Sequence, residues 1–232
     1  MIFEKKTAVA EFIHRPNRFI AQVKLNDEIL TVHVPNTGRL KEILLPGVKC
    51  LVRCEDNPAR KTSHSLIGAW KNDMLINFDS QIPNQVVAEA LLMGRVESLR
   101  QYDVIEREKT FESSRFDFRL KGDGLPDYYL EVKGVTLESG GIVSFPDAVT
   151  VRGARHLKEL AAAKAMGFGA GLLFLVQLET AEYFTPNTPM DPLFTESLKQ
   201  AAAKGVDIMA YLSHVTMKSL TLNRQIPVVI KT

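Results

Sequence analysis

The stretch from Arg115 to Thr136 contains three residues whose types and spacing suit a divalent-cation site. Asp117 lies in a short run that alternates like a β-strand, and Glu131 and Lys133 lie near the end of a second run. A Gly- and Pro-containing segment separates the two runs, so we expect a β-hairpin. Carboxylate oxygens are ligands that Mg²⁺ and Mn²⁺ prefer, and a bound cation polarises a phosphoryl oxygen and lowers the pKa of a water. Lys133 would position that water or stabilise charge developing on the phosphate.

Strand alternation predicts which side chains of the hairpin share a face. A regular second strand points Glu131 and Lys133 to the same side, and the hairpin can bring Asp117 beside them. The backbone carbonyl of Val132 would be a further oxygen ligand. In the first strand the opposite face is expected to carry three apolar side chains, Phe116, Phe118 and Leu120. The alternative is an ordinary exposed strand that carries charges of both signs.

A helix before the hairpin offers one more carboxylate. The segment Asn84–Gly94 has an apolar stripe with helical spacing, and we expect Asn84 to be its N-cap and Gly94 its C-terminal stop. Glu89 falls at the edge of that stripe. It is either a solvated rim residue or an inward-directed group that completes the cation's ligand shell, directly or through a water.

Residues 1–83 are predicted to form a small β-barrel. Short alternating runs recur between turn signals, without a long helix, at Thr7–Ile13, Arg18–Leu25, Glu28–Val34, Val48–Cys54, His64–Ala69 and Met74–Phe78. This number and spacing favour an oligonucleotide/oligosaccharide-binding (OB) type barrel. Such barrels bind their ligands through basic and aromatic side chains on one face. The residues available for that are Arg15, Arg18, Phe19, Arg39, Lys41, Arg53, Arg60 and Lys61.

Two interpretations of these barrel cations remain open. They form a nucleic-acid-binding face, or they are scattered charges that solvate a β-surface. The segment Pro35-Asn36-Thr37-Gly38 is a predicted turn. Its amides, next to Arg39, could also cradle a phosphate.

Residues 84–232 are predicted to form a mixed α/β domain, with a boundary near Pro83. The pattern gives a strand at Tyr102–Phe111, the hairpin, and then alternating helices and buried strands at Thr150–Met166, Gly169–Leu178, Asp191–Lys204 and Val206–Leu212. A mixed sheet with helices on its faces is expected.

The helix at Thr150–Met166 has a cationic side. Thr150 is its expected cap, and the buried face is expected to carry Val151, Ala154, Leu157 and Ala161. The opposite side would carry Arg152, Arg155, His156 and Glu159. Arg152 and Arg155 are candidates for phosphate contact. His156 is either a general base or a residue that hydrogen-bonds backbone or solvent.

Composition limits the class of protein. The chain has 232 residues, 45% hydrophobic, with a net charge of +2, which is typical of a globular protein. The first 83 residues carry 12 Lys and Arg against 9 Asp and Glu, a mild basic excess. No apolar run is long enough for a membrane helix. Two cysteines, Cys50 and Cys54, are too few for a disulfide framework, so a reducing cytoplasm is the expected location.

Four motifs stand out along the chain: the runs Arg115–Phe118, Glu131–Thr136 and Phe145–Leu157 and the turn Pro35–Gly38. Together they resemble one known family, the sugar fermentation stimulation protein A family, and the resemblance covers essentially the whole chain. It implies an N-terminal OB-type barrel joined to a PD-(D/E)xK nuclease-like domain. It also implies a DNA-binding protein connected with the regulation of sugar utilisation.

The nuclease-like pattern maps onto Asp117, Glu131 and Lys133, with Glu89 as the helix acid. Phe116 stands where the superfamily's name pattern has proline, which the chemistry does not require. Two functions therefore stay open: an Mg²⁺- or Mn²⁺-dependent nuclease, or a non-catalytic DNA-binding regulator on a retained nuclease scaffold. A carbohydrate-binding barrel is a third. In the first two, nucleic-acid contacts are expected from Arg15, Arg18, Arg39, Lys61, Arg152 and Arg155.

Overall fold

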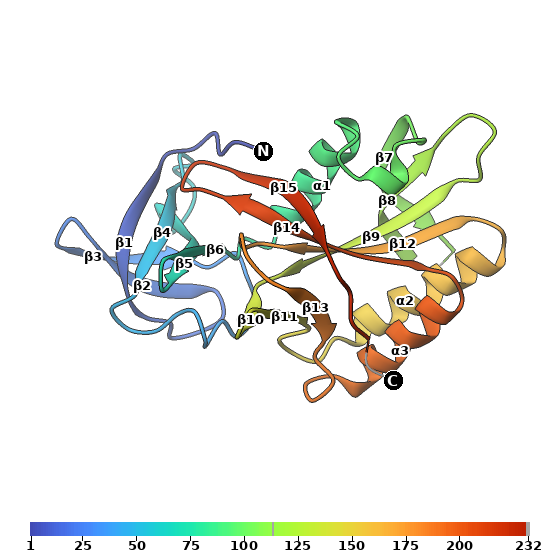
Figure 1. Ribbon diagram of the computed structural model, residues 1–232. Coiled ribbons are helices and arrows are strands. Elements are labelled where there is room, and N and C mark those ends of the chain that lie inside the picture. The colour runs from blue at the N-terminus through green and yellow to red at the C-terminus, as the bar shows by residue number, and fades with distance from the viewer. Residues whose placement is uncertain (113, 231–232) are drawn as a thin grey trace.

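The computed structural model describes residues 1–112 and 114–230, and its N-terminal part is a closed β-barrel (Figure 1). The strands are β1 (Thr7–His14), β2 (Ile20–Leu25), β3 (Glu28–His33), β4 (Lys49–Cys54), β5 (His64–Lys71) and β6 (Met74–Asn77). β1 pairs with β2 and β4, β2 with β3, and β4 with β5, while a parallel bridge from β3 to β5 closes the ring. β6 extends the sheet from β5. The predicted OB-type barrel is confirmed.

The C-terminal part is built on a second six-stranded sheet in the order β15-β14-β12-β9-β8-β7. Its strands are β7 (Val104–Phe111), β8 (Ser114–Lys121), β9 (Tyr128–Val135), β12 (Gly169–Val176), β14 (Asp207–Val215) and β15 (Leu220–Ile226). β7, β8 and β9 form an antiparallel meander, whereas β12 is parallel to both β9 and β14. The predicted mixed α/β domain is confirmed. Sequence alternation missed β15 and the small sheet of β10 (Leu137–Ser139), β11 (Ile142–Phe145) and β13 (Tyr183–Pro186).

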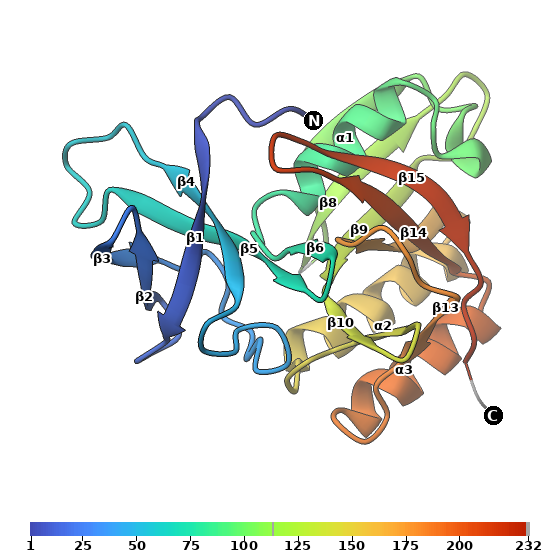
Figure 2. The same cartoon turned by 60° about the vertical axis from the view of Figure 1, so that its left-hand side comes forward.

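Helices cover both faces of this sheet (Figures 1 and 2). α1 (Pro83–Leu92) packs on one face, and α2 (Val151–Ala165) and α3 (Pro192–Ala203) pack together on the other. A short 3₁₀ turn, η1, spans Glu97–Leu99. Since β9 and β12 are parallel, the chain must cross over between them, and α2 lies on that crossover. None of the helices in the described residues is long and apolar enough to cross a bilayer.

A buried carboxylate fixes the start of both α2 and α3. Asp191 is 2% exposed and is the N-cap of α3, where it accepts a hydrogen bond from the Phe194 amide at 2.9 Å. Its second oxygen accepts from the amide of Thr150 at 2.8 Å. The Thr150 hydroxyl in turn accepts from Gly153 N, so its predicted role as cap is confirmed.

Two helix predictions were wrong. α1 begins one residue earlier than expected, with Pro83 in its first turn and Ile82 at the cap position, so Asn84 is not the N-cap. On α2, Ala154, Leu157 and Ala161 are buried as predicted, but Val151 is 73% exposed and His156 is 2% exposed, so the buried face includes His156 and leaves out Val151. Counting apolar residues cannot reveal a buried polar side chain whose partner lies elsewhere in the chain.

The first hairpin strand is less regular than expected. β8 pairs with β9 only from Phe118 to Leu120, and Glu108, which lies opposite Asp117 on β7, has φ +53°. Phe118 belongs to the core cluster on the α1 side of the sheet, but Phe116 packs against Tyr129 on the α2 side. The prediction that Phe116 and Phe118 share a face was therefore wrong. The regular alternation of side chains between the two faces of the sheet is therefore interrupted between Phe116 and Phe118.

The barrel and the α/β domain meet through buried polar groups. Gln177, just after β12 and 2% exposed, donates to Asn77 Oδ1 at 3.0 Å and to the carbonyl of Asp79 at 3.3 Å. At the molecule's N-terminus, the amide of Phe3 donates to the carbonyl of Lys218 in the β14–β15 hairpin at 2.8 Å. Figure 2 shows the N-terminus beside that hairpin. The barrel strands end at Asn77 and α1 begins at Pro83, so the predicted boundary after residue 83 falls in the first turn of α1.

A charged cluster stabilises the barrel beside this junction. The side chain of Glu55 is 1% exposed and accepts hydrogen bonds from Lys5 at 2.6 Å and from both Nε and Nη2 of Arg53. Arg53 also pairs with buried Asp79 at 2.7 Å. Burial by itself would raise the pKa of Glu55, but hydrogen bonds from Lys5 and Ser65 and the charge of Arg53 lower it to about 2.

We expect Glu55→Gln to destabilise the protein in a pH-dependent way. The folded-state pKa of about 2 lies below the ordinary value of about 4.3 expected in the unfolded chain, so the ionised Glu55 favours folding above pH 4.5. That contribution, roughly 2 kcal/mol, is lost as pH falls from 4.5 through about 2. Denaturant unfolding of both proteins across this range should show a difference that narrows as pH falls. Exposed Glu28→Gln is the control, and a pH-independent difference would contradict the assignment.

Candidate functional site

Asp117 is held at both carboxylate oxygens. Its Oδ1 accepts a hydrogen bond from the Asn84 side chain on α1 at 2.6 Å, and its Oδ2 accepts from the amide of Val132 at 2.8 Å. Burial and the negative charge of Glu131 nevertheless raise the pKa of Asp117 to about 6. The fold therefore fixes the position of this carboxylate while disfavouring its charge.

Glu131 has one oxygen fully engaged and one that is not. The residue is 2% exposed, and its Oε1 accepts from Lys133 Nζ and from His156 Nδ1, the latter at 2.6 Å. Burial acts to raise the pKa of Glu131, but the hydrogen bond from His156 and the charge of Lys133 outweigh it and the pKa is lowered. Within the described residues, the buried Oε2 has no hydrogen-bond partner. A buried carboxylate oxygen without a partner is costly, and this one is free to bind a cation.

The hydrogen bonds of His156 assign the roles of its two ring nitrogens. Arg152 Nε lies 3.3 Å from His156 Nε2, and a guanidinium can only donate, so Nε2 is the acceptor. Nδ1 is then the donor to Glu131 Oε1. Both ring nitrogens are engaged, so His156 orients Glu131 rather than standing free as a base.

Sequence reasoning named His156 but placed it on the wrong side of α2. The signal that could have found it is the spacing of Arg152 and His156, four residues apart and therefore neighbours on a helix. Its partner, twenty-five residues upstream on β9, carries no local signal.

Glu89 is not brought to Asp117. It forms an ion pair of 2.8 Å with the amino group of Met1. The α1 residue that contacts Asp117 is Asn84, and five residues along a helix correspond to a rotation of about 140° between the two side chains. The helix supplies an amide to the site in place of the expected carboxylate.

The donor set at this site is small. In the described part of the chain, no three or more His, Cys, Asp and Glu side chains are grouped to hold a metal ion. Asp117 and Glu131 provide two carboxylates, which fits Mg²⁺ better than Zn²⁺, since Mg²⁺ keeps several waters and uses one or two carboxylates. The unpartnered Glu131 Oε2 and the raised pKa of Asp117 both fit a cation bound between them.

Arg15 has a structural role that the sequence did not reveal. Its guanidinium donates to the backbone carbonyls of Arg18, Asn36, Gly38 and Arg39 at 2.6 to 3.2 Å. Burial lowers its pKa. Arg15 therefore holds the turn at residues 36–39 in shape and has little capacity left for a phosphate.

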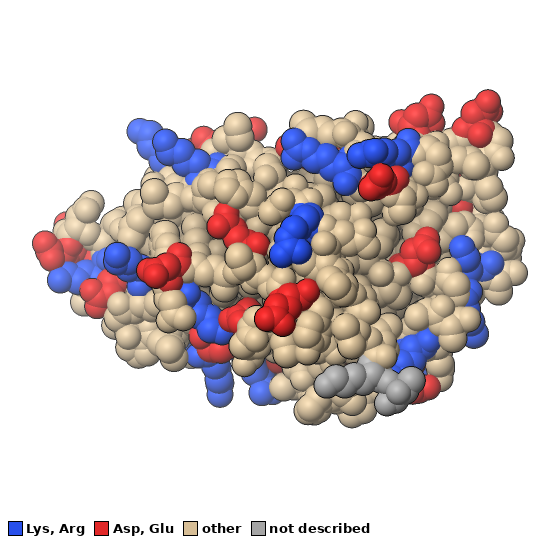
Figure 3. All heavy atoms as spheres, in the orientation of Figure 1, with Lys and Arg blue, Asp and Glu red and all other residues tan. Residues whose placement is uncertain are grey.

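The other predicted cations are exposed. Arg18 and Arg39 line a hollow beside the 36–39 turn, together with Lys41. Lys61 is exposed on the β4–β5 connection, and Arg155 on α2. Arg152 is exposed as well and also contacts His156, which links the cationic side of α2 to Glu131. On the face shown in Figure 3, charges of both signs are interspersed.

We expect Asp117→Asn to stabilise the protein without metal. Because the folded-state pKa of about 6 lies above the ordinary value of about 3.9, ionised Asp117 disfavours folding at neutral pH. Removing the charge should raise the free energy of unfolding by about 1–2 kcal/mol and Tm by roughly 3–6 °C. The gain should vanish below pH 4, where Asp117 is protonated in both states. Thermal unfolding with EDTA at pH 8 and pH 4 tests this, and a lower Tm at pH 8 would refute it.

Comparisons with known proteins agree with this architecture. The SfsA N-terminal OB domain matches residues 13–78, and the sugar fermentation stimulation protein RE domain matches residues 81–219. Proteins of Clostridium tetani and Clostridium acetobutylicum, each described as a "Sugar fermentation stimulation protein homolog", are 54% identical over 230 residues, 99% of this chain and 100% of each relative. A solved structure of Pyrococcus furiosus SfsA in complex with Ca²⁺ has a TM-score of 0.88 at 26% identity, covering 99% of this chain and 100% of that one. The chain belongs to the sugar fermentation stimulation protein (SfsA) family.

Proposed function

We propose that this protein binds DNA and hydrolyses its phosphodiester bonds with Mg²⁺ or Mn²⁺ at Asp117, Glu131 and Lys133. The observation that carries the proposal is the buried, unpartnered Oε2 of Glu131, beside the ammonium of Lys133 and a second carboxylate of raised pKa. A cation held between the two carboxylates would give this buried oxygen the partner that it lacks in the described residues.

Each group at the site would have a distinct task. Asp117 and Glu131 would hold the cation, which would supply a polarised phosphoryl oxygen and a water of lowered pKa. Lys133 would stabilise the charge that develops on the phosphate. Asn84 and the Val132 amide fix Asp117, and His156 fixes Glu131. Outer groups of this kind orient the ligands of a metal.

The related structures support a cation. The Pyrococcus furiosus relative was solved in complex with Ca²⁺, a hard cation that takes oxygen ligands. At 26% identity over the whole chain, this likeness supports a divalent-cation site in the present protein as well.

The barrel supports nucleic-acid binding. OB-type barrels commonly bind oligonucleotides, and the 36–39 turn presents Arg18, Arg39 and Lys41 together. Arg152 extends the cationic groups to the edge of the candidate cation site. Phosphates bound beside the 36–39 turn and at Arg152 would lie on either side of the junction between the barrel and the α/β domain.

One observation favours a second candidate function, a DNA-binding regulator that does not cleave. Nuclease sites of this class draw on a helix acid, and here Glu89 pairs with Met1 instead. Among the described residues, no third acidic side chain is grouped with Asp117 and Glu131. Two carboxylates could hold a cation without supporting turnover.

Cleavage assays decide between the two. Labelled single- and double-stranded DNA and RNA are incubated with Mg²⁺, Mn²⁺ or EDTA. We expect metal-dependent cleavage of DNA that Lys133→Met reduces by at least about a hundredfold, the scale of one lost electrostatic donor. Mn²⁺ should raise the Tm of the wild type but not of Asp117→Asn, which reports metal binding independently of turnover. Metal binding without cleavage of any substrate would establish the regulator instead.

Nucleic-acid binding should depend on the turn cations. We expect Arg18→Ala/Arg39→Ala to weaken DNA binding in EDTA and to reduce the slope of log K against log salt by about 0.7 for each lost phosphate contact with single strands, or 0.9 with duplex. Fluorescence anisotropy across a salt series measures both. The matched control is Lys199→Ala/Lys204→Ala on α3, which removes the same charge. Equal losses in both double variants would show that only net charge matters.

A further inference from the structure

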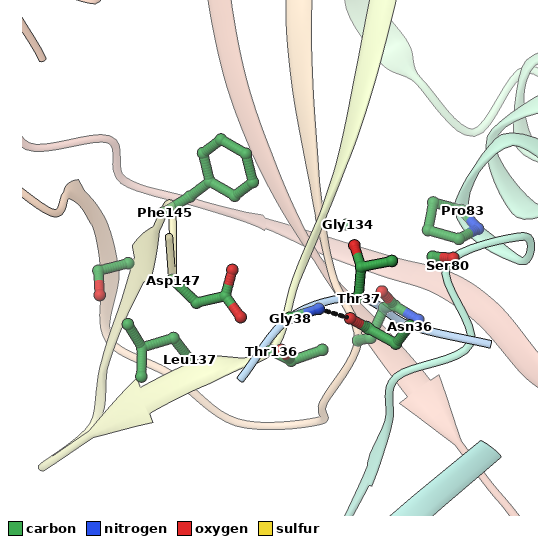
Figure 4. A pocket seen from close by; sticks show the side chains of 12 residues that line it. Asn36, Thr37, Gly38, Ser80, Pro83, Gly134, Thr136, Leu137, Phe145 and Asp147 are labelled. Carbon is green, nitrogen blue, oxygen red and sulfur yellow. Dashed lines mark hydrogen bonds between the residues drawn. The ribbon is translucent and has the colours of Figure 1, made fainter. Parts of the chain in front are cut away.

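A cavity of about 180 Å³ lies between the barrel and the α/β domain (Figure 4). The 36–38 turn closes it on the barrel side, and Pro83 borders it at the start of α1. Gly134 and Thr136, which follow Lys133 on and just after β9, line it on the side of the α/β domain.

Two glycines keep the cavity walls close together. A Cβ atom at Gly38 would lie 2.3 Å from Asp147 Oδ2, and one at Gly134 would lie 2.5 Å from Gln177 Oε1. Neither position can accept a larger residue unless its neighbours move. The short distance between the cavity walls therefore depends on Gly38 in the barrel and Gly134 in the α/β domain.

The cavity offers hydroxyl groups and a carboxylate, and no cation. The hydroxyls of Thr37, Thr136 and Ser144 have no hydrogen-bond partner within the described residues, and no Lys or Arg lines the space. Asp147 Oδ2 accepts from the amide of Arg39 at 3.1 Å, which anchors the carboxylate and leaves Oδ1 as an acceptor. Figure 4 shows Asp147 directed toward the turn. This lining repels a phosphate and suits a neutral group that carries N–H donors.

Cations lie on the other side of Asp147. A neighbouring hollow shares Thr37, Gly38, Phe145 and Asp147 with the cavity, and it adds the exposed side chains of Arg18 and Arg39. The cavity without cations and the hollow with Arg18 and Arg39 therefore adjoin at the carboxylate of Asp147. A polynucleotide has the same alternation, with neutral bases beside anionic phosphates.

We propose that this cavity binds one unpaired nucleobase that bears an exocyclic amino group, with its flanking phosphate at Arg18 and Arg39. This deepens the proposed function and rests on it. Asp147 would accept from the amino group, as carboxylates do from cytosine N4. In a duplex the base's pairing edge is occupied by its partner, so the cavity selects single strands, whose bases are read on that edge. Thymine and uracil, which lack the amino group, would be disfavoured.

The test compares fluorescein-labelled oligo-dC and oligo-dT of equal length by anisotropy, at neutral pH in EDTA, with the full chain. We expect the wild type to bind oligo-dC at least about fivefold more tightly, equivalent to roughly 1 kcal/mol of base discrimination. Asp147→Asn should reduce that ratio to within about twofold, because the amide is a weaker acceptor than the carboxylate. A duplex of the same length should bind equally well to both proteins.

The matched control is Asp123→Asn, which removes the same charge from the exposed β8–β9 turn. Thr136→Val serves as a second cavity variant that keeps the carboxylate. Equal binding of oligo-dC and oligo-dT by the wild type, or the same ratio in Asp147→Asn and Asp123→Asn, would overturn the cavity assignment while leaving DNA binding intact. No binding of any oligonucleotide would overturn both proposals. A rise in Tm with glucose or maltose that Asp147→Asn abolishes, without a base preference, would replace the nucleobase by a carbohydrate.

Discussion

Keeping a charged Glu131 inside the sheet is the constraint on which the α/β domain depends. A carboxylate that is 2% exposed loses most of its hydration, and the fold must replace it. Lys133 does so from the same strand, and His156 does so from α2. The second contact requires α2 to turn a polar side chain inward, which exposes Val151 instead. The orientation of the longest helix thus follows from one buried charge.

The same requirement explains the chain of contacts behind Glu131. His156 Nε2 accepts from Arg152 Nε, and its Nδ1 contacts Glu131. Asp191 fixes the start of α2 through the Thr150 amide, so Arg152 and His156 begin from a defined position. Within the described residues, one oxygen of Glu131 has two partners while the other has none. The cation that we propose would be the partner of the second oxygen.

The sequence was enough to predict the helices and strands whose apolar residues follow a repeating pattern. Alternating apolar runs located all six barrel strands, and the continuous apolar run at β12 marked a buried strand. Contacts between single residues that lie far apart in the chain could not be predicted, because no repeating pattern signals them. Arg15 looks like any surface arginine until the 36–39 turn is folded around it, and the separation of Phe116 from Phe118 depends on a departure from strand regularity at Asp117. Glu89 had the right residue type and helix, but its direction was set by Met1, eighty-eight residues away.

The pairing of residues 1–3 with the β14–β15 hairpin has a mechanical consequence. The barrel is attached to the α/β domain at both of its ends, once through Met1 to Phe3 and once through the segment that leads from β6 into α1. A body held by one connection can swing about it, whereas a second, separate connection limits the rotation to the axis through the two attachment points, and the Gln177 hydrogen bonds at the junction restrict that rotation as well. The hydrogen bond from the Arg39 amide to Asp147 also ties the 36–39 turn to the α/β domain. A nucleic-acid strand lying across both domains would meet a surface that is already close to its bound arrangement. Its binding free energy would then lose little to the cost of bringing two mobile domains together.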